Sequence, residues 1–212
     1  MLSYHYFSII NTTNVDFQNA IALYNQSFPV SEKLPISVIK NKIEADIFQL
    51  WIQKDQEKII LMAILCPLPN SNFTLLGYLA TAPEYRGQGL GKQFMTFIKN
   101  KLQKEEQWLL LEVENPHYQP EQELKKRRVN FYLRLGAKIL KDVAYLLPDL
   151  SEKNSPEMIL MIYPDYPEDK LNSLLIKELI KLIYQYFYDR PNHKNVNILI
   201  NKLPEKIKLI GY

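Results

Sequence analysis

One stretch of ten residues decides how the chain folds and what it binds: Pro83-Glu84-Tyr85-Arg86-Gly87-Gln88-Gly89-Leu90-Gly91-Lys92. It follows an apolar run over residues 72–81 that predicts a strand, and it leads into a helical stripe of Leu90, Phe94, Phe97, Ile98 and Leu102. Three glycines at alternate positions leave backbone N–H groups unobstructed, and the positive end of a helix attracts anions. Arg86 and Lys92 can add charge-assisted contacts to phosphates. The stretch therefore predicts an anion-binding loop between a strand and a helix.

The spacing of the glycines excludes two common phosphate-binding loops. A P-loop needs a glycine five residues before the Gly-Lys pair and a serine or threonine after it, and these places hold Arg86 and Gln93. The third glycine is also wrongly spaced for a dinucleotide-binding fingerprint, and the preceding strands predict a meander instead of a β-α-β unit. A nucleotide-dependent enzyme is therefore disfavoured.

Two segments resemble the GNAT superfamily of acetyl-CoA-dependent N-acetyltransferases. Arg86, Gly89 and Gly91 fill the family's loop pattern, Arg/Gln-x-x-Gly-x-Gly/Ala, after the matching context of residues 79–87. Residues 130–137, Asn-Phe-Tyr-Leu-Arg-Leu-Gly-Ala, resemble the family's Phe-Tyr-x-x-x-Gly-Phe block. The two segments occur in the family's order with a predicted strand between them. The resemblance covers about residues 55–147 and fades after about residue 165.

The resemblance implies how acetyl-CoA would be bound. The strand before the loop would pair its free backbone with the pantetheine arm, through Leu79, Ala80 and Thr81. The pyrophosphate would be held by the loop and the start of the helix: Arg86, Gly87, Gln88, Gly89, Leu90, Gly91 and Lys92. Asn115 is a candidate replacement for an asparagine that many family members carry on the later helix, where this chain has Lys125.

The resemblance also suggests catalytic residues. Tyr132 matches the tyrosine that donates a proton to the departing thiolate, although such a residue can also simply pack on the sheet. Glu112 and Glu114 share one face of a predicted strand, and either is a candidate base for the amine or a solvated or salt-bridged carboxylate. Arg128 stands where the family often has alanine. The basic run 125–128 indicates a solvated helix face, a role for Arg128 near the site, or an acidic acceptor.

The order of predicted elements indicates an α/β (α+β) fold with a mixed, mostly antiparallel twisted sheet flanked by helices. We expect strands over 2–10, 46–53, 57–66, 72–81, 108–113, 137–147 and 157–163. We expect helices from Asn14 or Asp16 to about Phe28, from Ser37, from Leu90, over 121–135, and as an added amphipathic helix from Pro167 to Phe187. The predicted division is a GNAT-like domain over 1–165 and a C-terminal extension over 166–212, which packs on the domain or on a partner.

The composition sets the cellular setting. The chain has 212 residues, a formal charge of +3 and a single cysteine, Cys66, so it has no disulfide framework and suits a reducing cytoplasm. Its three histidines are too far apart in sequence to indicate a metal site, and no apolar run is long enough for a membrane span. We expect no metal, no membrane and no nucleic acid as partner, and a monomer or homodimer.

The sequence thus predicts an enzyme that transfers an acetyl group from acetyl-CoA to a primary amine by direct attack on the thioester, with Tyr132 as general acid. The amine belongs to a small molecule or a protein. The alternative is a non-catalytic acyl-CoA-binding sensor or interaction module, suggested by the departures at Lys125 and Arg128.

Overall fold

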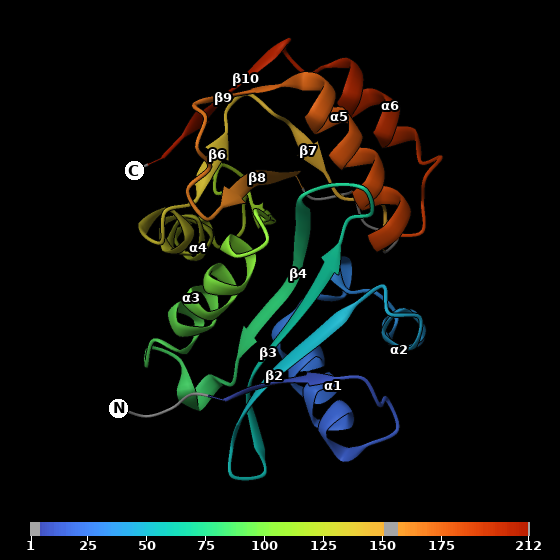
Figure 1. The fold of residues 1–212 in the computed structure, drawn as a ribbon, viewed down its shortest axis with the longest axis vertical. Coiled ribbons are helices and arrows are strands. Elements are labelled where there is room, and N and C mark those ends of the chain that lie inside the picture. The colour runs from blue at the N-terminus through green and yellow to red at the C-terminus, as the bar shows by residue number, and fades with distance from the viewer. Residues whose placement is uncertain (1–4, 151–156, 212) are drawn as a thin grey trace.

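The computed structural model describes residues 5–150 and 157–211, so residues 2–4 of the expected first strand lie outside the described part. Ten strands form one twisted mixed sheet in these residues (Figure 1), in the order β1-β2-β3-β4-β5-β8-β6-β10-β9, with β7 pairing β8. The strands are β1 (Tyr6–Ile9), β2 (Gln49–Asp55), β3 (Lys58–Pro67), β4 (Phe73–Thr81), β5 (Trp108–Glu114), β6 (Lys138–Leu140), β7 (Tyr145–Leu146), β8 (Glu157–Tyr163), β9 (Lys170–Asn172) and β10 (Lys206–Ile210). The predicted α/β class with a mostly antiparallel sheet is confirmed.

Two helices cover one face of the sheet near the N-terminus. α1 (Val15–Ser27) begins after Asn14, whose side-chain oxygen accepts a hydrogen bond from Phe17 N at 2.8 Å, so Asn14 is the cap. A single 3-10 turn, η1 (Val30–Glu32), leads to α2 (Ile36–Glu44), which begins directly after Pro35. Buried side chains of α1 and α2, such as Tyr24 and Ile39, join the larger of two hydrophobic cores.

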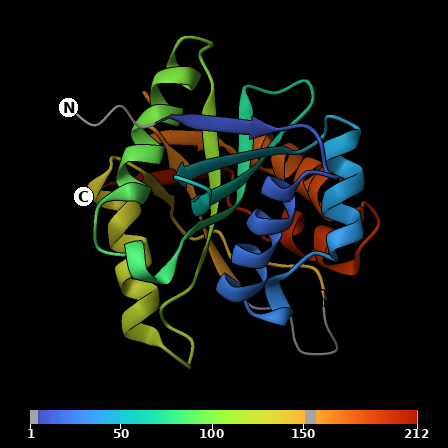
Figure 2. The ribbon, with the colours of Figure 1, turned by 90° about the horizontal axis from the view of Figure 1, so that it is seen from below.

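The opposite face is covered by two other helices. A 3-10 turn, η2 (Pro83–Tyr85), precedes α3 (Leu90–Gln103), and α4 (Gln122–Arg134) follows β5. The predicted apolar stripe of α3 lies in the second core with Leu109 and Leu111 of β5. Figure 2 shows α3 and α4 on one side of the sheet and α1 and α2 on the other.

The two central parallel strands separate halfway along their length. β4 and β5 are in register from Phe73↔Trp108 to Leu76↔Leu111, and no later pair joins them. β4 nevertheless continues to Thr81 along β3, with a register shift that leaves Gly77 without a counterpart between Leu76 and Tyr78. This bulge bends β4 away from β5 and opens a fork in the sheet.

The C-terminal region differs from the predicted single long helix. The expected helix from Pro167 is preceded by β9, and it consists of α5 (Ser173–Leu182) and a π-helical turn, η3 (Ile183–Phe187). The tail forms α6 (Lys194–Asn201) and β10, and β10 pairs with β6. The extension therefore adds two strands to the edge of the sheet, which periodicity could not reveal because both are shorter than six residues. Its apolar stripe docks on the same chain, in the core shared with α1 and α2.

One further expected strand differs in the structure. The strand predicted over 137–147 is interrupted, and β6 and β7 are separated by a turn at Asp142, whose φ is +60°.

No helix in the described part of the chain is long and apolar enough to cross a membrane.

Candidate active site

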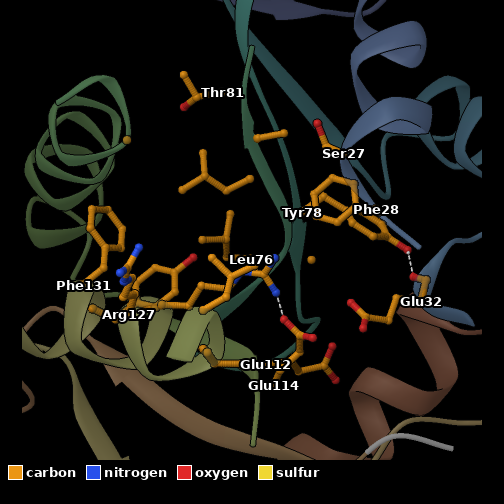
Figure 3. Close-up of a pocket in the computed structure, with 18 of the residues that line it drawn as sticks. Ser27, Phe28, Glu32, Leu76, Tyr78, Thr81, Glu112, Glu114, Arg127 and Phe131 are labelled. Carbon is orange, nitrogen blue, oxygen red and sulfur yellow. Dashed lines mark hydrogen bonds and ion pairs between the residues drawn. The ribbon is translucent and has the colours of Figure 1, made fainter. Parts of the chain in front are cut away.

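The fork between β4 and β5 opens into a cavity of about 1150 Å³. This is somewhat above the roughly 300–1,000 Å³ of ordinary small-molecule pockets, so the space suits two substrates. Figure 3 shows residues of α4 on one side of the cavity, residues of α1, η1 and β4 on the other, and the β5 carboxylates between them. Among the labelled residues, Phe131 and Arg127 belong to α4, Glu112 and Glu114 to β5, and Ser27, Glu32 and Tyr78 to α1, η1 and β4.

The glycine loop lies at one end of this cavity, which Arg86, Gly87, Gly89, Gly91 and Lys92 line. Gly87 and Gly89 have φ values of +78° and +81°, which strain any side-chain-bearing residue, so the loop needs glycine there. Gly89 is the residue that precedes α3, and the first N–H groups of a helix have no acceptor within it. The donors, the positive helix end and two cationic side chains therefore fit an anionic phosphate group.

The predicted pantetheine strand also lines the cavity, through Leu79, Ala80 and Thr81. These residues lie beyond the last β4–β5 pair, on the stretch of β4 that pairs only with β3. The Arg86 side chain donates from Nε to the Thr81 carbonyl at 3.2 Å and thereby joins the loop to the strand. The backbone of this stretch of β4 is therefore unpaired on the side of the fork, where an extended ligand could form hydrogen bonds with it.

Three of the predicted cofactor residues do not line the cavity. Leu90 is buried in the core between α3 and the sheet, and Gln88 donates its side-chain amide to the Glu84 carbonyl. Asn115 donates to Glu157 Oε1 at 2.8 Å and accepts from His117 N at 3.0 Å, so it organises the loop after β5. The structure thus gives no support for a pantetheine contact by the Asn115 side chain.

Tyr132 of α4 lines the cavity on the side of α3. Burial raises the pKa of its hydroxyl to about 12, although Arg128 partly opposes this shift. Its ring packs against Phe131, with centroids 5.0 Å apart. No acceptor for its hydroxyl occurs among the described residues, so the protonated hydroxyl is available to a ligand.

Glu112 stands at the point where the fork opens, one residue beyond the last β4–β5 pair. Burial raises the pKa of its carboxyl to about 7, and hydrogen bonds from two tyrosines oppose a larger rise. Tyr145 donates to Oε1, and Tyr188 donates to Oε2 at 2.7 Å. A carboxylate with a pKa near neutrality, lining a cavity, has the properties of a general base.

Glu114 is engaged differently. Its carboxylate forms an ion pair with Arg128 of α4, drawn as a dashed line in Figure 3. The arginine is half-exposed, so the pair lies at the rim of the cavity. The two glutamates that share one face of the strand therefore have separate surroundings, one with neutral hydroxyl donors and one with a cation.

Several cavity residues were not predicted. Glu32 of η1 lines the cavity, and its pKa is raised by burial against the opposing charges of Arg128 and Lys125. Phe28, Tyr78 and Phe187 add an aromatic wall, with 4.8 Å between the rings of Phe28 and Tyr78 and 5.8 Å between Tyr78 and Phe187. These residues carry no local motif, because only the fold brings them together.

The described residues include no group of three or more histidine, cysteine, aspartate and glutamate side chains placed to hold a metal ion. Cys66 is buried in the larger core and away from the cavity lining, and burial raises the pKa of its thiol to about 12. A thiol in this protonated state is a poor nucleophile.

Known proteins resemble the chain in sequence and in structure. Residues 46–136 match the family model of the acetyltransferase (GNAT) domain. A protein of Bacteroides thetaiotaomicron assigned to the GNAT family superposes with a TM-score of 0.70 at 24% identity, covering 87% of this chain and 98% of that one. The resemblance to the GNAT superfamily that the motifs predicted is confirmed.

Two more distant structures share the fold. The ribosomal-protein-S18-alanine N-acetyltransferase of Escherichia coli gives a TM-score of 0.56 at 18% identity, with 78% of this chain and 96% of that one covered. A GNAT-family acetyltransferase of Elizabethkingia anophelis with acetyl-CoA bound gives 0.52 at 14% identity, with 76% and 98% covered. No curated protein sequence matches the chain significantly.

Proposed function

We propose that the chain transfers an acetyl group from acetyl-CoA to a primary amine, with Tyr132 as general acid and Glu112 as general base. One observation carries the proposal: residues of the glycine loop and Glu112, which stands where the fork opens, line the same cavity. The likeness to GNAT proteins, one of which is described with acetyl-CoA bound, supports the choice of cosubstrate.

The residues at the loop end would hold the cosubstrate. The N–H groups of residues 87–91 would donate to the pyrophosphate, and Arg86 and Lys92 would neutralise its charge. Backbone groups of Leu79–Thr81 would pair with the pantetheine arm, because β5 no longer occupies that side of β4. Bound there, acetyl-CoA supplies a thioester carbonyl for the amine to attack and a thiol as the leaving group.

The residues at the fork would move the protons. An ammonium ion has no lone pair, so the acceptor must lose a proton before it attacks, and Glu112 would take that proton. The pKa of Glu112, about 7, makes it both deprotonated often enough and basic enough near neutral pH. Tyr132, whose pKa is about 12, stays protonated and would donate its hydroxyl proton to the departing sulfur.

Glu114 is the weaker candidate for the base. Its carboxylate is already engaged in an ion pair with the Arg128 cation, whereas the carboxylate of Glu112 has hydroxyl partners. We propose that the pair instead fixes Arg128 at the rim of the acceptor side. The acceptor itself is an amine of a small molecule or of a protein, and the chain would act in the cytoplasm without a metal or nucleic acid.

The test is free-thiol release from acetyl-CoA with a broad panel of amines, together with calorimetric titration of CoA. We expect turnover that falls by about 10²-fold or more in Tyr132→Phe and in Glu112→Gln, with CoA affinity retained. Tyr118→Phe is the matched control, because Tyr118 is exposed, lies outside the cavity lining and donates its hydroxyl to Glu157, which is not a proposed catalytic residue. Tight CoA binding without turnover of any amine would instead favour a non-catalytic acyl-CoA sensor.

A further inference from the structure

The carboxylate of Glu112 is held by two tyrosines from segments far apart in the chain. Tyr145 lies on β7 and donates to Oε1, and Tyr188 directly follows the π-helical turn η3 and donates to Oε2 at 2.7 Å. Both rings are buried, with 0% and 6% of their surface exposed. Each oxygen of the carboxylate thus has one hydroxyl donor, which fixes the plane of the group.

The position of Tyr188 is determined by the packing of the turn before it. The ring of Phe187 lies against Gly77 so closely that a Cβ atom there would be 2.3 Å from two ring carbons. Lys42 of α2 donates to the Tyr186 carbonyl at 2.6 Å and pairs with Asp189 at 2.7 Å. These contacts hold both neighbours of Tyr188 in place, and the Tyr188 ring itself packs against the rings of Phe187 and Tyr184, with centroids 4.8 Å and 5.9 Å away.

We propose that Tyr188 is a positioning residue. Its hydroxyl orients the carboxylate of Glu112 and keeps it ionised, so that the C-terminal segment completes the catalytic site. This inference rests on the proposed function. Tyr188 lies outside residues 46–136, the part that matches the family model. A π-helical turn re-aims the side chains that follow it, and such turns occur often at functional sites.

The physical reason is the competition between burial and hydrogen bonding. Burial favours the neutral carboxyl of Glu112, whereas a donated hydrogen bond favours the carboxylate. Burial, followed by the charge of Glu112, raises the pKa of both Tyr145 and Tyr188 well above 10, so both remain donors at any pH where Glu112 titrates. Other titratable groups that interact electrostatically with Glu112 are Glu32, Cys66, Tyr78 and Tyr184.

The simpler interpretation is that Tyr188 only fills space in the core. Tyr184 provides the matched control, because it lies in the turn η3 that Tyr188 follows, is fully buried, and donates at 2.5 Å to the Leu146 carbonyl instead of to Glu112. Tyr184→Phe and Tyr188→Phe each remove one buried hydroxyl. A purely structural role predicts similar effects of the two changes on stability and no specific effect on Glu112.

The first measurement is an NMR titration of the carboxyl carbons of ¹³C-labelled glutamate, in which Glu112→Gln identifies the Glu112 signal. We expect Tyr188→Phe to raise the pKa of Glu112 by about one to two units, because one hydrogen bond to the charged form is lost. Tyr184→Phe should leave it within about 0.3 units. An unshifted Glu112 in a folded Tyr188→Phe variant would overturn the inference.

The second measurement is the pH dependence of kcat/KM for the best amine of the panel. The acid limb should move upward by the same amount in Tyr188→Phe, with KM for acetyl-CoA unchanged. An acid limb that stays in place while the Glu112 signal shifts would overturn the catalytic role of the contact. Failure of the proposed function looks different, since the wild-type protein would then turn over no amine while the NMR titration still reported on the contact.

Discussion

The contact between Phe187 and Gly77 makes a steric prediction that needs no assumption about the reaction. Gly77→Ala would place a Cβ atom 2.3 Å from two carbons of the Phe187 ring, whereas carbon atoms in contact are normally about 3.5–4.0 Å apart. One of the two groups must therefore move by more than 1 Å. The φ of Gly77 is not in the left-handed region, so the effect of alanine is steric and does not arise from backbone strain.

The ring has little room to move. Phe187 is 1% exposed, and its centroid is 5.0 Å from that of Phe48 and 4.8 Å from that of Tyr188. Overpacking a core of this kind typically costs about 1–3 kcal/mol. For a chain of this size, each kcal/mol lowers the Tm by about 2–4 °C. We therefore expect Gly77→Ala to unfold roughly 2–12 °C below the wild-type protein.

The assay is thermal unfolding followed by circular dichroism, with a double-mutant cycle. Phe187→Leu shortens the group that collides with the new methyl, so the double variant Gly77→Ala/Phe187→Leu should be more stable than the sum of the two single effects by about 0.5–3 kcal/mol. Gly136→Ala is a different control, because its cost would come from a φ of +94° and nothing lies within 4 Å of the added atom, so Phe187→Leu should not relieve it. Additive effects of Gly77→Ala and Phe187→Leu would refute the proposed collision.

Three further predictions concern charge. Because the carboxyl pKa of Glu112 is raised from 4.5 to about 7, its contribution to stability is fully present below pH 4.5 and is lost as pH rises through 7. The unfolding free energy of the wild-type protein should therefore fall by up to about 3 kcal/mol across this window relative to Glu112→Gln, measured by urea denaturation, and equal pH profiles would contradict the buried carboxyl. Lys42→Met should lower the free energy of unfolding by about 1–3 kcal/mol, because the Tyr186 carbonyl loses a buried donor. An unchanged urea midpoint would show that this hydrogen bond does not stabilise the protein. Arg86→Ala should raise KM for acetyl-CoA about tenfold with a smaller change in kcat, and a change in kcat alone would place Arg86 outside the phosphate site.

The sequence by itself was sufficient where the signal is local. The glycines at 87 and 89 indicate a loop that leads into a helix, and they lie within a few residues of the first turn of that helix. The family block around Tyr132 likewise occupies one turn of a helix followed by its glycine. Such features depend on neighbours along the chain, so the anion-binding loop, the fold class and the two helices α3 and α4 could all be predicted.

The tertiary structure alone decided how the acceptor side is built. The sequence placed Glu112 and Glu114 on one face of a strand, but it could not separate them, because their partners, Tyr188 and Arg128, come from distant elements. The C-terminal segment shows the same limit. Its apolar periodicity predicted a helix that packs on the domain or on a partner. The π-helical turn, the contact of Phe187 with Gly77 and the strands β9 and β10 could not be predicted, because they depend on contacts between residues far apart in sequence. Hydrophobic periodicity records that a face is buried, but it does not record which side chain that face meets.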